Sequence, residues 1–328
     1  MEATDFVARE HATPPEEGQS CPPSRRRSPK MRVAAFLAET LGGPISKLAP
    51  LPGGESSQAF GFLANGHHYV IRVSGNSSSF EMDRYAYHHF SSAEIPIPEI
   101  VQTGNFDDTL HYAISRKLHG KLLDELSDEE HGKTLPSLIE TMDSIHQIDV
   151  RSQGKYGNWD KNGEAHLDSW EQYVLSIKDS VPYGTDWTSL FETSSMEPAL
   201  LDRVCGRIPE LVAYCPEDIS LIHGDFGFDN VLADDGLVTA VLDWGGSKYG
   251  DFLYDVAWLI FGSDRYDADT FRRHYDSLDT PIPHFRERVF CYQSHIGLGI
   301  TGFFAATQQP KKFTRTRDRL TCLLDTEP

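Results

Sequence analysis

The stretch from Leu221 to Asp255 constrains the fold of this chain more than any other part of its sequence. Within it, Asp225 and Asn230 lie five residues apart, and Asp243 follows after a run typical of a β-hairpin. All three side chains carry hard oxygen atoms, which suit Mg²⁺ when phosphate and water complete its coordination. A further carboxylate beside such a metal can orient a hydroxyl and accept its proton, as phosphoryl transfer requires.

The spacing resembles the catalytic loop of protein kinases, where an Asn follows five residues after the Asp of His-Arg-Asp and an Asp-Phe-Gly comes later. Here the motifs read His223-Gly224-Asp225 and Asp243-Trp244-Gly245. The central Gly and the Trp are similar to the aminoglycoside phosphotransferase family, and Gly250-Asp251 with Asp255 resembles its third motif. The resemblance covers most of the chain from about Val33 onward. One motif alone could be a plain turn, but three in the right order argue against that alternative.

The strand-like run Tyr69–Val73 carries Arg72 where protein kinases have a Lys that binds nucleotide phosphates. Arg keeps the positive charge and can form a fork of hydrogen bonds to phosphate. This run, Asp83–Phe90 and Ile95–Pro98 are similar to the hygromycin B phosphotransferases within the family. The resemblance implies that Asp83 pairs with Arg72. The alternative is a surface ion pair, which would contribute little stability.

Two further segments are expected to contact ATP. The strand-like run Leu110–Leu118 falls where kinase-like folds have the hinge between lobes, whose backbone binds adenine. We expect that contact at Ser115, Lys117 and Leu118. Small residues before a hairpin at Asn65-Gly66 would leave backbone amides free to approach a phosphate. These residues are Gly53, Gly54, Ser56 and Ser57.

Charge and cysteine content exclude several classes of protein. The 49 acidic and 30 basic residues give a net charge of −19, which disfavours nucleic acid as a partner. A negative field would attract a cationic small molecule, although acidity can also serve solubility alone. Five scattered cysteines without a Cys-x-x-Cys fit a reducing cytoplasm. No run of 18 apolar residues and no secretory signal occur, so we expect a cytoplasmic monomer without a membrane partner.

The predicted fold class is α+β, with two lobes like those of protein kinases. Residues 1–30 are rich in Glu, Pro, Ser and Arg and are predicted to be disordered. Residues 31–116 should form a nucleotide-binding lobe with an antiparallel sheet and one long helix. Residues 117–328 should form a mostly helical lobe with the catalytic loop. Helices are expected at Arg32–Leu41, Thr134–Val150, Pro198–Tyr214, Val256–Phe261, Ala268–Ser277, Phe285–Ala306 and Leu320–Leu324.

The resemblance also implies a role for each residue. Asp225 would accept or orient the proton of the acceptor hydroxyl, and Asn230 and Asp243 would hold Mg²⁺. Arg72 and the loop 53–57 would contact the ATP phosphates. The third motif, Asp251 and Asp255, is expected to support the catalytic loop without touching substrate. His223 is expected to be a packed, hydrogen-bonded residue that orients the loop and not a base.

The sequence constrains the identity of the compound that accepts the phosphoryl group less than it constrains the nucleotide site. The catalytic loop and Ile296-Gly-Leu298 resemble the hygromycin B phosphotransferases, which implies an aminoglycoside acceptor and antibiotic resistance. Two alternatives remain: a kinase of another small hydroxyl compound, such as a metabolite amine or sugar, and a catalytically weak nucleotide-binding protein. Carboxylates that could bind the ammonium groups of an aminoglycoside, or could be only solvated surface charges, are Asp160, Glu164, Asp168, Asp186, Asp264 and Asp267.

Overall fold

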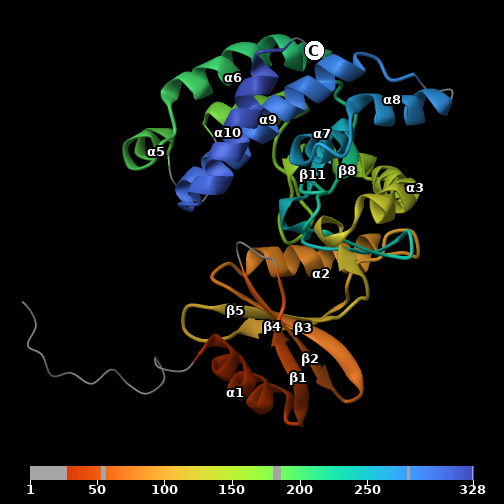
Figure 1. Ribbon diagram of the computed structural model, residues 1–328, viewed down its shortest axis with the longest axis vertical. Helices are drawn as coiled ribbons and strands as arrows, with labels where there is room; N and C mark the ends of the chain where they lie inside the picture. The colour runs from red at the N-terminus through yellow and green to blue at the C-terminus, as the bar shows by residue number, and fades with distance from the viewer. Residues whose placement is uncertain (1–27, 53–56, 180–185, 279–280, 327) are drawn as a thin grey trace, which may run out of the picture.

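A computed structural model describes residues 28–52, 57–179, 186–278, 281–326 and 328. The chain forms a small lobe on one antiparallel sheet and a larger, mostly helical lobe (Figure 1). This arrangement confirms the predicted α+β class and the two-lobed, kinase-like architecture. Most of the predicted N-terminal extension, residues 1–27, lies outside the described residues, as do Gly53, Gly54 and Ser56.

The sheet of the small lobe has its strands in the order β1-β2-β3-β5-β4. β2 and β3 pair along their whole length, and Asn65 and Gly66 form the turn between them with φ of 50° and 79°. Positive φ at both residues is the geometry of a type I′ turn, which Asn-Gly favours. The predicted hairpin is therefore confirmed. The strands are β1 (Ile45–Pro50), β2 (Gln58–Ala64), β3 (His67–Ser74), β4 (Ile100–Asn105) and β5 (His111–Arg116).

Helix α1 (Pro29–Leu41) covers one face of this sheet. Val33 and Leu37 are buried in one cluster with Phe62 and Ile71 of the sheet. The helix begins three residues before the predicted start at Arg32, because Pro29 occupies its first turn, where a missing N–H costs nothing.

Helix α2 (Ser78–Phe90) lies between the sheet and the large lobe (Figure 1). Phe80 packs with Ile100 of the sheet, whereas Phe90 belongs to the core of the large lobe. The helix therefore has apolar contacts in both directions and holds Asp83 at the junction of the lobes.

The large lobe is built around α9 (Phe285–Ala306), which packs against α6, α7 and α10. Two small sheets, in the orders β10-β9-β6 and β7-β11-β8, carry the motif loops. The other helices are α3 (Asp128–His146), α4 (Trp170–Leu175), α5 (Trp187–Thr193), α6 (Pro198–Leu211), α7 (Leu253–Gly262), α8 (Ala268–Ser277) and α10 (Pro310–Leu324). The strands are β6 (Lys121–Leu122), β7 (Gly157–Asn158), β8 (Ser220–Ile222), β9 (Val231–Asp234), β10 (Leu237–Val241) and β11 (Lys248–Gly250).

Helices α8 and α9 match their predicted bounds, whereas α3, α6, α7 and α10, like α1, differ from theirs. α3 starts six residues before Thr134, because Ser127 and Glu130 form a reciprocal capping box. α10 begins at Pro310, ten residues before the predicted start at Leu320, so the basic run Lys311–Arg319 is helical as well. Its helical spacing places Phe313, Leu320 and Leu324 on a buried face.

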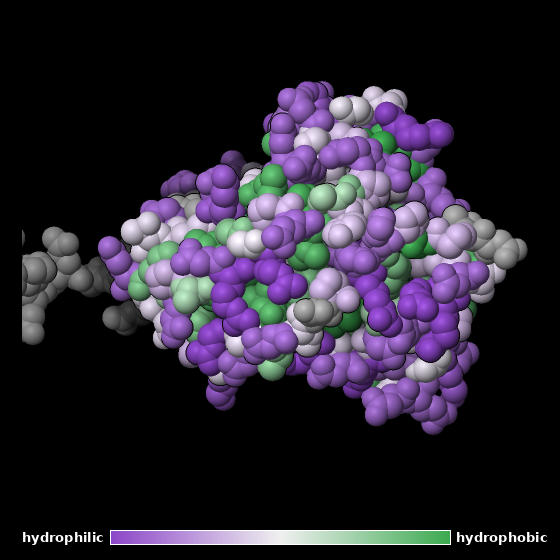
Figure 2. All heavy atoms as spheres, turned by 90° about the horizontal axis from the view of Figure 1, so that it is seen from above, coloured by the Kyte–Doolittle hydropathy of each residue, from purple (hydrophilic) through white to green (hydrophobic). Residues whose placement is uncertain are grey.

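The surface is dominated by polar side chains. Figure 2 shows one face on which hydrophilic residues prevail and apolar ones form scattered spots. Within the described ranges, no helix is long and apolar enough to cross a bilayer. The exposed large apolar side chains lie on separate elements, as single ones do on most protein surfaces. They are Met31, Val101, Tyr214, Leu237 and Leu278.

Candidate active site

A cleft of about 350 Å³ lies between the lobes and is lined by residues from both. Its volume is in the range of small-molecule sites. Asp225 is not among the residues that line it, but it contacts one of them, Asn230. The predicted site residues that line the cleft are Ser57, Arg72, Asp83, Ser115, Lys117, Leu118, Asn230 and Asp243.

Arg72 of β3 and Asp83 of α2 form an ion pair across the small lobe. Their side chains are only 19% and 5% exposed, so this is not the surface pair of the alternative interpretation. Burial lowers the pKa of Arg72, but attraction by Asp83 and Asp243 outweighs burial, and the guanidinium stays charged. The other oxygen of Asp83 accepts the backbone N–H of Trp244 at 2.7 Å. Asp83 thus ties the phosphate-facing arginine to the Asp-Trp-Gly motif.

The catalytic loop connects β8 to β9 and brings Asp225 and Asn230 together. The amide nitrogen of Asn230 donates to the Asp225 carboxylate at 2.8 Å and to its backbone carbonyl at 3.0 Å. Burial raises the pKa of Asp225 well above its usual value, and repulsion from Asp229 and Asp243 adds to the shift. Asp225, Asp229 and Asp243 therefore lie close enough to one another to repel.

Asp255 of α7 holds the start of the catalytic loop. Its carboxylate accepts the backbone N–H groups of His223 at 2.9 Å and Gly224 at 2.8 Å, and it also pairs with His146 at 3.0 Å. Burial alone would raise the pKa of Asp255, but the hydrogen bond and charge of His146 and the backbone donors lower it. These bonds confirm the expected support of the loop by Asp255.

The His223 ring is fully buried beneath the loop. Its Nε2 lies 2.9 Å from the Leu242 carbonyl, and its Nδ1 accepts the Asp225 backbone N–H at 3.3 Å. Burial lowers its pKa, which keeps the ring neutral with one donor and one acceptor. His223 therefore orients the loop, as expected, and does not face an acceptor as a base.

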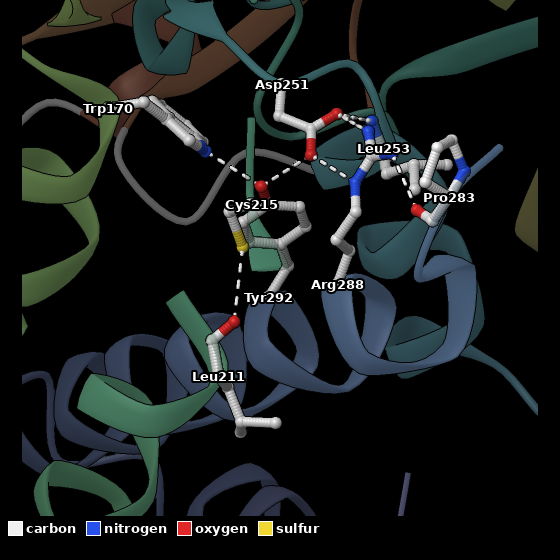
Figure 3. A network of polar contacts seen from close by, with 8 residues as sticks. All are labelled: Trp170, Leu211, Cys215, Asp251, Leu253, Pro283, Arg288 and Tyr292. Carbon is white, nitrogen blue, oxygen red and sulfur yellow. Dashed lines mark hydrogen bonds and ion pairs between the residues drawn. The ribbon is translucent and has the colours of Figure 1, made fainter. Parts of the chain in front are cut away.

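Asp251, the other half of the third motif, has a different role. Arg288 of α9 binds both its oxygens, at 2.9 and 2.6 Å, and the Tyr292 hydroxyl donates to it at 2.6 Å. Trp170 in turn donates to that hydroxyl at 2.9 Å (Figure 3). Asp251 thus ties the segment before α7 to α9 and α4. The expectation that it supports the catalytic loop directly is corrected.

The side chains at the cleft fit Mg²⁺ by their chemistry. Because the amide nitrogen of Asn230 is bound to Asp225, its carbonyl oxygen is left for another partner. Asp243 lines the same cleft and adds a carboxylate. No cluster of three or more His, Cys, Asp or Glu side chains suited to a metal occurs in the described part of the chain. An Asn and an Asp therefore suit a metal that takes its other ligands from phosphate and water.

None of the six carboxylates considered for an aminoglycoside lines this cleft. Two of them cap helices, two form ion pairs with nearby cations, and one closes a turn, while Glu164 is exposed. Local roles of this kind do not need a ligand. The helix caps are Asp186 and Asp267, the carboxylates in ion pairs are Asp168 and Asp264, and the residue that closes a turn is Asp160.

The structure also reveals site residues that motif reading passed over. Asp229 lines the cleft, and its place beside Asn230 was a usable signal. Glu125 lines it from the far side of the hinge. His146 binds Asp255, and Lys248 lies against Gly224 of the catalytic loop. No sequence signal marks either residue, because these contacts are with residues distant in the chain.

Two lobes, an intervening cleft and an Asp–Asn–Asp set beside a paired arginine define a kinase-like phosphotransferase. The model of the phosphotransferase enzyme family matches residues 47–286. The chain therefore belongs to this family, and the resemblance to aminoglycoside phosphotransferases is confirmed.

Individual relatives were compared by sequence and by structure. The chain is 36% identical over 232 residues to the hygromycin-B 4-O-kinase of Escherichia coli, spanning 70% of this chain and 66% of that protein. It is 25% identical over 169 residues to the aminoglycoside 3′-phosphotransferase of Enterococcus faecalis, spanning 51% and 59%. A crystal structure of a thermostable mutant of aminoglycoside phosphotransferase APH(4)-Ia, in complex with ADP and hygromycin B, superimposes with a TM-score of 0.78 and 30% identity, covering 89% of this chain and 98% of that one.

Proposed function

We propose that this chain is an ATP-dependent O-phosphotransferase that acts on a hydroxyl of an aminoglycoside of the hygromycin B type. The observation that carries the proposal is the placement of Asp225 by Asn230 beside a cleft that holds Arg72, Asp83 and Asp243. The hygromycin-B 4-O-kinase relative and the APH(4)-Ia complex with ADP and hygromycin B support the choice of nucleotide and acceptor.

ATP would lie in the cleft between the lobes. The N–H groups of Arg116 and Lys117 already donate to Glu99 at 2.9 Å and His68 at 3.0 Å, so adenine would bind the Lys117 carbonyl and Leu118. Of the three residues predicted to bind adenine, Ser115, Lys117 and Leu118, we therefore propose the last two. Arg72 would neutralise phosphate charge, and Ser57 lines the same cleft. Held by Asn230 and Asp243, Mg²⁺ would neutralise charge on the β- and γ-phosphates.

Asp225 would orient the acceptor hydroxyl and take its proton as the hydroxyl oxygen bonds to the γ-phosphorus of ATP, while the bond from that phosphorus to the bridging oxygen breaks and ADP leaves. Asn230 fixes the direction of its carboxylate, and Asp255 fixes the backbone that carries it. Most of the rate enhancement would then come from positioning and charge neutralisation.

The setting of the reaction is also a proposal. The net charge of −19 suits a polycationic acceptor. We propose a monomer in a reducing cytoplasm, with residues 31–116 as nucleotide lobe and 117–328 as catalytic lobe. Free cysteines at four described positions agree with that compartment. They are Cys205, Cys215, Cys291 and Cys322.

The test is kcat/KM for hygromycin B, kanamycin and a few amine metabolites with excess Mg-ATP. We expect hygromycin B to exceed kanamycin by about tenfold or more, since one missing charged contact costs about that much. Asp225→Asn should lower kcat by about 10²-fold or more and leave nucleotide affinity unchanged, because a base acts on the acceptor. Turnover of a metabolite with none of hygromycin B would refute the aminoglycoside assignment and leave the kinase chemistry standing.

A further inference from the structure

Lys248 is a buried cation that the proposed mechanism does not use. It begins β11, between the Asp-Trp-Gly and Gly-Asp motifs, and is only 3% exposed. Lysine is rarely buried so deeply without a partner. Its ammonium donates to the Gly246 carbonyl at 2.6 Å and lies 4.7 Å from the ring centre of Tyr254 and 5.8 Å from that of Tyr173.

The ammonium lies directly against the backbone of the catalytic loop. An ideal Cβ built on Gly224 would stand 2.0 Å from Nζ of Lys248 and 2.3 Å from the Gly246 carbonyl oxygen. Gly224 also has φ of +79°, a conformation that side chains disfavour. The glycine between His223 and Asp225 thus leaves the space that the ammonium occupies.

The charges around Lys248 favour an interaction with the loop. Burial lowers the pKa of Lys248 to about 8, against the attraction of Asp255 and Asp225. Burial, aided by repulsion from Lys248, lowers the pKa of His295 to about 3 and so keeps that ring neutral. The ionisable groups that face the ammonium are Asp225, Asp255, His223, His295, Tyr173 and Tyr254.

We propose that Lys248 is a positioning residue for phosphoryl transfer: its ammonium, seated in the space beside Gly224, is the internal positive charge against which the Asp225 carboxylate is held. The inference rests on the proposed function of Asp225. Lys248 is not among the residues that line the cleft and acts through the loop.

Two substitutions separate charge from packing. Lys248→Met keeps the length of the side chain without the charge, and Lys248→Gln keeps a donor for the Gly246 carbonyl without the charge. We expect kcat to fall about tenfold or more in both variants, with KM for ATP and for the acceptor within about twofold of the unaltered protein. Lys155→Met, at an exposed lysine paired with Asp168, is the control and should change neither quantity.

The pH profile gives a readout that packing alone would not move. Lys248 loses its proton as pH rises through about 8, so kcat of the unaltered protein should decline there toward the rate of the Met variant. The Met and Gln variants should lack that decline. Comparison with the same acceptor cancels the titration of the acceptor's own amines.

Four results would overturn the proposal. They are a folded Met variant with kcat within twofold of normal, a Gln variant that restores the normal rate, an alkaline decline retained in both variants, and a loss confined to KM. If the Met variant does not fold, the proposal is tested by the Gln variant and by the pH dependence of kcat in the unaltered protein. A kcat that stays constant from about pH 7 to 9.5 would then refute the proposal. Rates are measured with the acceptor that the unaltered protein phosphorylates fastest, so a wrong choice of aminoglycoside would not disturb this test.

Discussion

Replacing Asp255 with Asn tests how far the catalytic loop depends on one buried carboxylate. The two oxygens of Asp255 accept from His223 N–H, Gly224 N–H and His146. An Asn side chain offers only one oxygen, and its amide must point a donor at groups that are themselves donors. Either backbone N–H of the loop, or its partner histidine, is then left buried without an acceptor.

The magnitude follows from these bonds. Hydrogen bonds to a charged group contribute about 1.5–3 kcal/mol each, and one buried donor left unpaired costs about 1–3 kcal/mol. Because Asn still accepts one or two of the bonds, we expect a loss of about 3–5 kcal/mol of unfolding free energy. For 328 residues this corresponds to a decrease of about 4–7 °C in Tm. A loop displaced by about 1 Å should also lower kcat, by roughly 10²-fold.

Thermal unfolding followed by tryptophan fluorescence measures the first quantity, and phosphotransfer at 25 °C measures the second. Asp168→Asn is the matched control, because Asp168 is exposed and pairs only with Lys155. That control should leave both Tm and kcat unchanged. An Asp255→Asn protein with normal Tm and normal kcat would refute the reasoning that this carboxylate holds the loop.

The Asp255 carboxylate also determines whether the stability of the protein rises or falls as the pH is lowered. The folded-state pKa of Asp255 is lowered below its usual value of 3.8, chiefly because His146 and the loop N–H groups outweigh burial. Its contribution to stability is therefore fully present above about pH 4 and is lost as pH falls through the lowered pKa. Asp255→Asn should flatten this part of the Tm profile, whereas an unchanged acid limb would contradict the assignment.

Two further substitutions test the nucleotide side and the distal network. Arg72→Met should weaken ADP binding in calorimetry by about tenfold or more, because a charge-assisted contact to phosphate is lost, and an unchanged Kd would remove Arg72 from the site. Tyr292→Phe deletes the hydroxyl between Asp251 and Trp170 and leaves a buried indole N–H unpaired, which should cost about 1–3 kcal/mol of unfolding free energy. Its kcat should stay normal, and a slower enzyme with normal unfolding would show that Asp251 acts on the catalytic loop after all.

Local features of the fold were predictable from sequence because their causes are local. Asn65-Gly66 favours the positive φ values of a type I′ turn whatever surrounds it. The bounds of α8 and α9 follow from apolar spacing along one helix face. The error at α3 has a local cause as well, since Ser127 and Glu130 were a readable capping box before the first apolar residue.

The spacing within a single loop carried the prediction of the catalytic pair. Only four residues separate Asp225 from Asn230 in the loop between two short strands, so the two side chains are kept close together. Arg72 lies near the end of a strand and Asp83 in the helix that follows. Their pairing was predicted from the family resemblance and not from their spacing. Their burial, which makes the pair more than a surface contact, became visible only with the large lobe in place.

The sequence by itself determined which side chains are available for phosphoryl transfer, because the order and spacing of the motifs decide which side chains share a loop. Tertiary structure alone decided which of the many remaining charges matter. It paired the carboxylate of Asp264 with Arg319 of α10, and it brought Lys248 against Gly224. The physical reason is that burial and charge pairing arise from contacts between distant segments, and the free energy of an ionised group depends on those surroundings far more than on its neighbours in sequence.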